Sequence, residues 1–308
     1  MTKPDGPRFA FLVNPHAGGG SAPKTVVALA RALREAGAQV DVTYTTSIAE
    51  TPALVAAAVA QGSVVVAVGG DGMVSSVAGA IADAGGVLAV IPAGRGNDFA
   101  RMLEIPHDTA AQARLLLTGT PHRVDLLRVE QPARTAVMVA GSVYAGVDAR
   151  AAEMGDRSRW VPAPLQYPVA AVRALASYRP VDCVLEVDGV GSEHRAATVV
   201  IANSRYYGKG MAIAPAARVD DGLLDVIVIE AAGRLELIRA LPTLYDGRHV
   251  DLPEVSVLTG RQVSLSGLHR GGGSVSVGAD GEALGALPPD PGTPLRIDVV
   301  PNALTVVR

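Results

Sequence analysis

Apolar and polar positions in the first third of the chain alternate as a repeated strand–helix unit. Short apolar runs of strand length cover residues 8–13, 40–44, 64–68 and 87–91, and the segments 22–36, 51–60 and 74–84 have the helical period. Glycine-bearing turns follow three of the strands, at residues 14–21, 69–72 and 94–97. This alternation predicts a doubly wound parallel sheet, whose ligands bind beyond the carboxyl ends of the strands.

Beyond residue 124 the pattern changes, because strand-like runs follow one another with few helical segments between them. These runs cover residues 124–129, 135–140, 181–187, 197–202, 224–229, 263–265, 275–277 and 295–300. A succession of short strands predicts an antiparallel sandwich or an open barrel. The main exception is the segment 149–178, for which we expect helix and loop.

Composition and charge exclude several classes of protein. The 308 residues are 49% hydrophobic and 19% charged, with a formal net charge of -3, which is typical of a globular protein. No apolar run reaches the roughly 18 to 20 residues of a membrane-spanning helix, and the first residues lack the pattern of a secretory signal, so we expect a cytoplasmic protein. The mildly acidic balance argues against nucleic acid as a partner.

Cysteine and histidine offer little for metal chemistry. Cys183 is the single cysteine, which excludes an internal disulfide framework, and it lies in an alternating strand pattern that favours a core position. The six histidines never stand four residues apart, so the helical pair of a zinc hydrolase is missing. Carboxylates, arginines and glycines remain as the carriers of chemistry.

The turn Gly69-Gly70-Asp71-Gly72 joins a buried strand to the start of a helix. Glycines let backbone N–H groups approach a polyphosphate, and the helix dipole favours its negative charge. A carboxylate fits beside such a ligand only if it holds Mg²⁺ or accepts a proton from the attacking hydroxyl, which singles out Asp71. The alternative is a tight turn in which Asp tolerates unusual dihedral angles.

A second turn, at residues 93–98, follows the next strand and therefore falls at the same edge. Its Asn97 and Asp98 suit a helix cap equally well. The segment 18–25 is not a Walker loop, because Pro23 stands where that loop needs its second glycine, and no dinucleotide-binding fingerprint follows the first strand.

Several motifs occur in a fixed order along nearly the whole chain: Asn14-Pro15-His16-Ala17-Gly18, Gly69-Gly70-Asp71-Gly72, and the segments 92–101, 124–126, 202–211, 214–226 and 280–282. In this order they resemble the diacylglycerol kinase catalytic domain family, the bacterial lipid kinases related to sphingosine and ceramide kinases. The resemblance implies a doubly wound α/β nucleotide-binding domain of the NAD kinase and diacylglycerol kinase type over residues 1–128. It also implies an all-β sandwich domain over 129–300 that receives the lipid, ATP in the cleft between the domains, and a terminal strand over 301–308 that returns to the first domain.

The resemblance also implies which residues contact the nucleotide. They are Asn14, Pro15, His16, Ala17, Gly18, Thr45, Gly69, Gly70, Gly72, Met73, Ser75, Ser76, Gly94, Arg95, Asn97 and Asp98. Asp71 is implied to lie beside the γ-phosphate and its Mg²⁺. Met73, Ser75 and Ser76 depart from the Thr, Asn and Glu common in the family, so polar contacts are lost there. Arg95 replaces a usual Thr, and its guanidinium either grips phosphate or blocks it.

Two further acidic motifs carry implied roles. Glu282 resembles the family's catalytic base, which deprotonates the lipid hydroxyl as it attacks the γ-phosphoryl group. From the residues alone, Asp280-Gly281 favours a plain hairpin turn, and the family's motif order reverses that preference. Asp221 resembles the ligand of a structural Mg²⁺ loop that the backbone carbonyls of Arg218 and Leu223 complete, with an ordinary Asp-Gly turn as the alternative.

The lipid is expected to meet the protein at the inner membrane surface. The segment 150–179 carries five arginines against two acids, with Trp160, Tyr167 and Tyr178 as aromatic residues, which favours peripheral attachment. An ordinary solvated surface is the alternative. Asp148 resembles a residue that contacts the lipid headgroup, and we place Arg101 on the lipid side with it.

Three functions remain open. The first is an ATP-dependent lipid kinase that uses Mg²⁺, with diacylglycerol as the default acceptor and phosphatidic acid as the product. The second is a soluble-substrate kinase of the NAD kinase type, which the stretch at residues 97–101 disfavours, and the third is a non-catalytic nucleotide- or lipid-binding regulator. The pattern leaves open the acyl chains, the choice between ATP and GTP, and the oligomeric state, a homodimer included.

Overall fold

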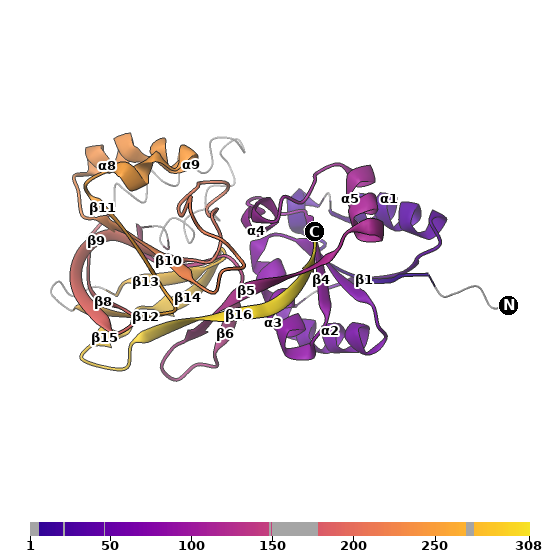
Figure 1. The fold of residues 1–308 in the computed structure, drawn as a ribbon, viewed down its shortest axis with the longest axis horizontal. Coiled ribbons are helices and arrows are strands. Elements are labelled where there is room, and N and C mark those ends of the chain that lie inside the picture. The colour runs from indigo at the N-terminus through magenta and orange to yellow at the C-terminus, as the bar shows by residue number, and fades with distance from the viewer. Residues whose placement is uncertain (1–5, 21, 46, 148, 150–177, 269–273) are drawn as a thin grey trace.

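The computed structural model describes residues 6–20, 22–45, 47–147, 149, 178–268 and 274–308. Its elements form two domains that lie side by side along the long axis of the molecule (Figure 1). The helix and loop predicted over 149–178 fall almost wholly outside the described residues. None of the helices in the described ranges is long and apolar enough to cross a bilayer.

Four parallel strands form the sheet of the first domain: β1 (Arg8–Val13), β2 (Gln39–Tyr44), β3 (Val64–Gly69) and β4 (Val87–Pro92). Their order is β2-β1-β3-β4, so the winding direction reverses between β1 and β3. The helices are α1 (Ala22–Glu35), α2 (Thr51–Ala60), α3 (Asp71–Ala84), α4 (Asp98–Met102) and α5 (Thr109–Thr118), with 3₁₀ turns at Ala17–Gly19 and Ile48–Glu50. The predicted doubly wound fold is confirmed.

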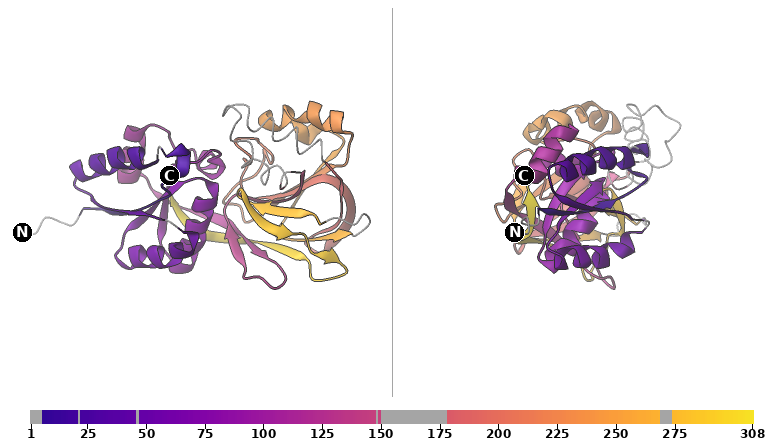
Figure 2. Two further views of the ribbon diagram at one scale, coloured as in Figure 1. Left: turned by 180° about the vertical axis from the view of Figure 1, so that it is seen from behind. Right: turned by 90° about the vertical axis from the view of Figure 1, so that its right-hand side faces the viewer.

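Apolar side chains cover both faces of this sheet. Phe9, Phe11 and Val66 belong to the cluster under α1 and α5, whereas Leu12 and Val65 belong to the cluster under α2 and α3. The end-on view in Figure 2 shows the strands between helices on either side. Burial on both faces explains why β3 and β4 are continuous apolar runs in the sequence.

The second domain is built mainly from antiparallel strands. They are β5 (Pro121–Glu130), β6 (Val137–Val139), β7 (Ser142–Gly146), β8 (Val181–Val187), β9 (Val190–Ala202), β10 (Leu224–Glu230), β11 (Val255–Gly260), β12 (Gln262–Leu268), β13 (Ser276–Ala279), β14 (Glu282–Ala286), β15 (Pro289–Asp290) and β16 (Leu295–Val307). The short helices α8 (Arg234–Ala240) and α9 (Thr243–Asp246) and a 3₁₀ turn at Arg248–Asp251 add to the predicted strands. Helix α8 was not among the predicted elements, and none of its residues is buried.

The last strand, β16, belongs to both domains. It pairs with β12 at one end and with β5 along its length, and its Thr305 and Val306 pair in parallel with Val87 and Leu88 of β4. Figure 1 shows this yellow strand running from the second domain into the first. The run predicted over 295–300 therefore continues to Val307, past an irregularity between Val300 and Leu304.

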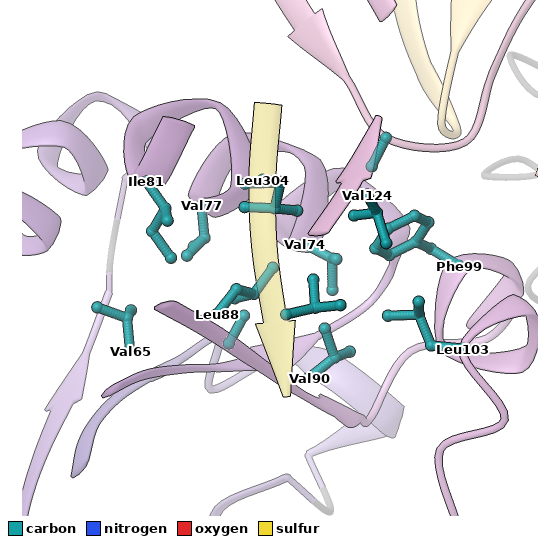
Figure 3. Packing of buried hydrophobic residues seen from close by; sticks show 14 of the residues in the cluster. Val65, Val74, Val77, Ile81, Leu88, Val90, Phe99, Leu103, Val124 and Leu304 are labelled. Carbon is teal, nitrogen blue, oxygen red and sulfur yellow. The ribbon is translucent and has the colours of Figure 1, made fainter. Parts of the chain in front are cut away.

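Leu304 brings the end of the chain into the core of the first domain. The side chain is 1% exposed and lies in the cluster that includes Val74, Val77 and Leu88. Figure 3 shows Leu304 on β16 beside the α3 residues Val74 and Val77. The first domain is therefore completed by residues from the far end of the sequence.

Candidate active site

The three glycine-bearing turns lie together at one edge of the first sheet. Asn14 N, just after β1, donates to Val68 O at 3.0 Å, and Ala93 N, just after β4, donates to Gly69 O at 3.0 Å. Thr45, after β2, donates to Val13 O through its backbone N at 2.9 Å and through its hydroxyl at 3.3 Å. The junction between β1 and β3 is the switch point at which sheets of this kind bind ligands.

The segment after β1 leaves the strand in a tight turn. The Asn14 Oδ1 atom accepts a hydrogen bond from His16 N at 2.9 Å. Ala17 is buried in the cluster beside α1, whereas His16 and Gly18 are exposed. Of the predicted nucleotide contacts in this segment, the Ala17 side chain packs in the core, and Asn14, Pro15, His16 and Gly18 remain at the sheet edge.

Helix α3 begins at Asp71, three residues before the predicted start at Val74. Gly70 is its extended N-cap, and a Cβ added at Gly70 would lie 3.3 Å from Gly94 Cα. A Cβ added at Gly69 would lie 2.8 Å from Met73 Sδ. The glycines therefore allow the second turn and the Met73 side chain to pack closely against this one.

Two of the departures from the family pattern point into the protein. The Met73 side chain packs against the core cluster under α2 and α3. Ser75 is buried, and its Oγ accepts a hydrogen bond at 3.0 Å from the N–H of Ala140, which lies between β6 and β7 of the second domain. Ser76, the third departure, is half-buried.

Asp71 caps the next helix, a role that the sequence did not suggest. Its Oδ1 accepts a hydrogen bond from Phe99 N at 3.2 Å, and the backbone N–H groups of Asn97 and Asp98 also bind the carboxylate. Its Oδ2 lies toward Gly96, where an added Cβ would be 2.7 Å away. Burial raises the pKa of the Asp71 carboxyl, and these backbone hydrogen bonds counteract the rise.

Asn97 closes the second turn. Its Oδ1 accepts a hydrogen bond from Gly94 N at 2.8 Å and its Nδ2 donates to Gly94 O at 3.1 Å. Asn97 occupies the N-cap position of α4 but makes no side-chain cap bond, so the interpretation of this side chain as a helix cap is wrong. The left-handed φ of 56° at Asn97 fits a residue type that tolerates this conformation.

Asp98 links the two domains. The buried carboxylate accepts hydrogen bonds from Lys209 N at 2.9 Å and from Gly210 N at 2.6 Å. Burial, and then the charge of Asp71, raise the pKa of Asp98 to about 6. Because both of its oxygens bind backbone donors, Asp98 holds the turn at residues 208–210 against the first domain.

Cationic side chains lie around the junction between the two domains. The Arg101 guanidinium lies over the Tyr206 ring, with 5.7 Å between Cζ and the ring centroid. Burial, and then the charge of Arg95, lower the pKa of Lys209. Arg95 and Lys209, one from each domain, therefore stand close enough for their charges to interact.

Glu282 reaches the first domain from a hairpin of the second. A Cβ added at Gly72 would lie 2.7 Å from Glu282 Oε1 and 3.1 Å from its Cγ. Asp280 and Gly281 form the hairpin turn between β13 and β14, with left-handed φ values of 44° and 87°. The hairpin interpretation is confirmed, and this turn places Glu282 against Gly72 at the start of α3.

The predicted metal loop is a turn on the surface. Asp221 Oδ1 accepts a hydrogen bond from Leu223 N at 3.0 Å, and the Arg218 guanidinium pairs with Asp220 at 3.2 Å. Burial, and then the charge of Asp221, raise the pKa of Asp225 to about 6. Among the described residues there is no group of three or more His, Cys, Asp and Glu side chains suited to a metal ion.

Asp125 and Asn203 are buried polar residues that were not among the predicted site residues. Asp125 accepts hydrogen bonds from Gly222 N at 2.7 Å and from Asn302 N at 2.7 Å. Asn203 Nδ2 donates to Asp125 O and to Ala140 O, each at 2.9 Å. The motifs at residues 124–126 and 202–211 contain both residues, so motif order pointed to these segments without revealing that they bind each other.

Only some of the residues predicted to lie on the lipid side are among the described residues. Asp148 and most of the arginine-bearing segment lie outside the described residues. At the end of that segment, Tyr178 is buried and Arg179 is exposed. Arg101 lies beside the 206–210 turn, as described above.

Comparison with known proteins assigns a family model to each domain. The model of the diacylglycerol kinase catalytic domain matches residues 8–129. The model of the YegS C-terminal NAD kinase beta sandwich-like domain matches residues 141–308. Together the two matches span both of the domains seen in the structure.

Whole-chain relatives agree with these models. A diacylglycerol kinase of Mycobacterium tuberculosis is 32% identical over 306 residues, which cover 98% of this chain and 95% of the relative. A relative from Stenotrophomonas maltophilia that carries the name lipid kinase YegS-like is 31% identical over 72% of this chain and 74% of its own length. A crystal structure of a diacylglycerol kinase from Bacillus anthracis has a TM-score of 0.72 at 19% identity, covers 99% of this chain and 98% of its own, and supports the fold.

Proposed function

The chain belongs to the diacylglycerol kinase family of lipid kinases, and we propose that it transfers the γ-phosphoryl group of ATP to the hydroxyl of diacylglycerol to give phosphatidic acid. Relatives named as diacylglycerol kinases support this acceptor. The YegS-like relative makes other lipid alcohols the second group of acceptors to test.

The contact between Glu282 and Gly72 carries this proposal. It brings a carboxylate of the second domain to the helix N-terminus that follows the Gly69–Gly72 turn. The first N–H groups of a helix lack intrahelical acceptors and bind phosphate readily. A base beside a phosphate site is the arrangement that phosphoryl transfer to a hydroxyl requires.

In the proposed reaction, Glu282 accepts the proton of the lipid hydroxyl. The hydroxyl oxygen forms a bond to the γ-phosphorus, and the bond from that phosphorus to the bridging oxygen of the β-phosphate breaks, so that ADP leaves. The backbone N–H groups at the start of α3 hold the phosphate oxygens. Asn14 and Thr45 contact the nucleotide at the neighbouring strand ends. Gly94 and Arg95 close over it from the second turn.

The residues around Asp71 fit Mg²⁺. This ion usually takes one or two carboxylates together with phosphate oxygens and water, and Asp71 Oδ2 is the oxygen that Phe99 does not use. The raised pKa of Asp71 marks a buried charge that a nearby cation would favour. We therefore assign Asp71 as the protein ligand of an ion that, when bound, neutralises the charge that develops on the phosphates.

For the loop at 218–223 we retain the structural Mg²⁺ proposal. The closeness of the Asp221 and Asp225 charges supports it, because a cation there would relieve their repulsion. Asp221 would contribute a carboxylate oxygen, and Arg218 and Leu223 their backbone carbonyls.

We further propose that the enzyme works as a peripheral protein at the inner membrane surface. Arg179, at the end of the arginine-bearing segment, is exposed, and so is Arg101 over the Tyr206 ring; such cations attract anionic headgroups. Asp148 remains a predicted headgroup contact.

Transfer of labelled γ-phosphate from ATP to lipids in mixed micelles tests the function. We expect the wild-type protein to label diacylglycerol in the presence of Mg²⁺. Glu282→Gln should lower turnover at least about 100-fold and leave the affinity for ATP within a few fold, because the base acts only in the chemical step.

The exposed residue Glu186, changed to Gln, is the matched control and should keep normal turnover. Near-normal turnover of Glu282→Gln would remove this residue from the mechanism. Labelling of ceramide or a sphingoid base instead of diacylglycerol would change the acceptor, and labelling of NAD without lipid would favour a soluble-substrate kinase.

A further inference from the structure

The turn that carries Glu282 is fixed to the rest of the protein by the side chain two residues before it. The Asp280 carboxylate accepts hydrogen bonds from three consecutive backbone N–H groups: Ala140 at 3.0 Å, Gly141 at 3.0 Å and Ser142 at 2.8 Å. Asp280 N in turn donates to Ser142 O at 3.2 Å. These four bonds hold the turn on residues 140–142, which lead from β6 into β7.

The same segment is bound to helix α3. Ser75 Oγ accepts a hydrogen bond from Ala140 N, and the Ser75 side chain is also hydrogen-bonded to Asp280. Helix α3, which begins with Asp71 and Gly72, and the hairpin that carries Glu282 are therefore both hydrogen-bonded to residues 140–142. Gly281 N donates to the Tyr144 hydroxyl at 3.1 Å, which holds the residue next to Glu282 as well.

We propose that Asp280 is a positioning residue for Glu282. It locks the hairpin turn to residues 140–142 and thereby sets the distance from the Glu282 carboxylate to the start of α3. This inference rests on the proposed role of Glu282 as the base. Charge-assisted hydrogen bonds are short and directional, and a displacement of about 1 Å in a catalytic group can lower a rate about 100-fold.

The chain contains a matched control for this residue. Asp188 and Gly189 form the turn between β8 and β9 with φ values of 48° and 83°, close to those of Asp280 and Gly281. The Asp188 carboxylate also accepts backbone hydrogen bonds, from Arg261 N and Gln262 N at 2.9 Å each. This second Asp-Gly turn belongs to the same domain, and none of its contacts involves Glu282.

The experiment measures turnover, KM for ATP and thermal stability with dioleoylglycerol in detergent mixed micelles. Asp280→Asn keeps the shape of the side chain but replaces one acceptor oxygen with a donor. We expect it to lower kcat at least about 10-fold and to leave KM for ATP within about twofold, whereas Asp188→Asn keeps kcat within about twofold. Equal kcat values in the two variants would overturn the proposal.

A double substitution separates positioning from general damage. If Asp280 acts through Glu282, then Asp280→Asn should change kcat less than about twofold when Glu282→Gln is already present. A further loss of about 10-fold in the double variant would show that Asp280 acts elsewhere and would overturn the proposal.

Gly141→Ala provides a second route if Asp280→Asn does not fold. The added Cβ would overlap with Asp280 Oδ1, so it displaces the carboxylate without removing its charge. We expect the same fall in kcat, and unchanged kcat would count against the proposal. Full activity of Glu282→Gln would overturn the proposed base and this inference with it. Loss of activity in Glu282→Gln together with normal kcat in Asp280→Asn would overturn this inference alone.

Discussion

At the scale of single residues, the two carboxylate oxygens of Asp71 face different neighbours. Oδ1 accepts a hydrogen bond from Phe99 N in α4, and Oδ2 lies toward Gly96, on the side we assign to the metal ion. The sequence suggested a choice between holding Mg²⁺ and accepting a proton. The structure shows that the same side chain also fixes the turn at residues 93–98. Removal of the Asp71 side chain would therefore disturb both the proposed metal site and this turn.

Replacement of Asp71 by Asn should separate these tasks. The amide oxygen can still accept a hydrogen bond from Phe99 N. Burial raises the pKa of the Asp71 carboxyl, so the charged form is unfavourable there and the substitution removes it. We therefore expect thermal stability equal to or above that of the wild type. Turnover should fall about 100-fold or more across a Mg²⁺ titration, because the metal loses its carboxylate. Asp83→Asn, on the exposed end of the same helix, should leave both properties unchanged. Turnover of Asp71→Asn equal to that of Asp83→Asn would contradict the assignment.

At the scale of elements, α3 depends on glycines at two points of close approach. Gly72 lies against Glu282 of β14, and Gly79 lies against Met138 of β6, where an added Cβ would be 3.2 Å from Met138 Cβ. Neither glycine has a positive φ, so these positions need the small side chain and not an unusual backbone.

Gly72→Ala should therefore reduce activity without reducing stability. Alanine favours a helix over glycine by about 1 kcal/mol, and the end of the Glu282 side chain can move away from the new methyl group at small cost. That movement takes the base from its place, so we expect kcat to fall at least about 10-fold while the Tm stays the same or rises. Gly79→Ala, on the same helix, should retain activity within about threefold. Normal kcat in Gly72→Ala would show that the position of Glu282 is unimportant.

The elements also show what the sequence could and could not predict. The buried strand β3, the alternating strand β8 and the helix α2 were predicted within one residue of their ends, because their sequence patterns are local. The partners of Asp98 and Asp280 were not predictable, since they are backbone N–H groups at Lys209 and Ser142 that any residue except proline offers. Ser75 was expected to face the nucleotide, and only the fold reveals Ala140 as its partner.

At the scale of the whole molecule, β16 makes the two domains one structural unit. Its Leu295 and Ile297 lie in the core cluster of the second domain, and its Leu304 and Val306 lie in that of the first. The pairing of β16 with β5 runs from Arg296 to Val307, so both strands cross between the domains together. Asp98 and Asp280 add polar links at the same junction, and the distance between Asp71 and Glu282 is therefore set by the packing of both cores.

The substitution Leu304→Ala tests whether β16 couples the unfolding of the two domains. The side chain is 1% exposed, and removing a fully buried leucine from a core lowers the free energy of unfolding by about 2 to 5 kcal/mol. Because β16 is shared, we expect one unfolding transition at lower denaturant, with faster hydrogen exchange in β3 and in β8 together. Val190→Ala, which is 75% exposed on the second domain, should change the free energy by less than about 0.5 kcal/mol. Two separate transitions, with β8 as well protected as in the wild type, would show that the domains fold independently and that β16 does not couple the two halves of the site.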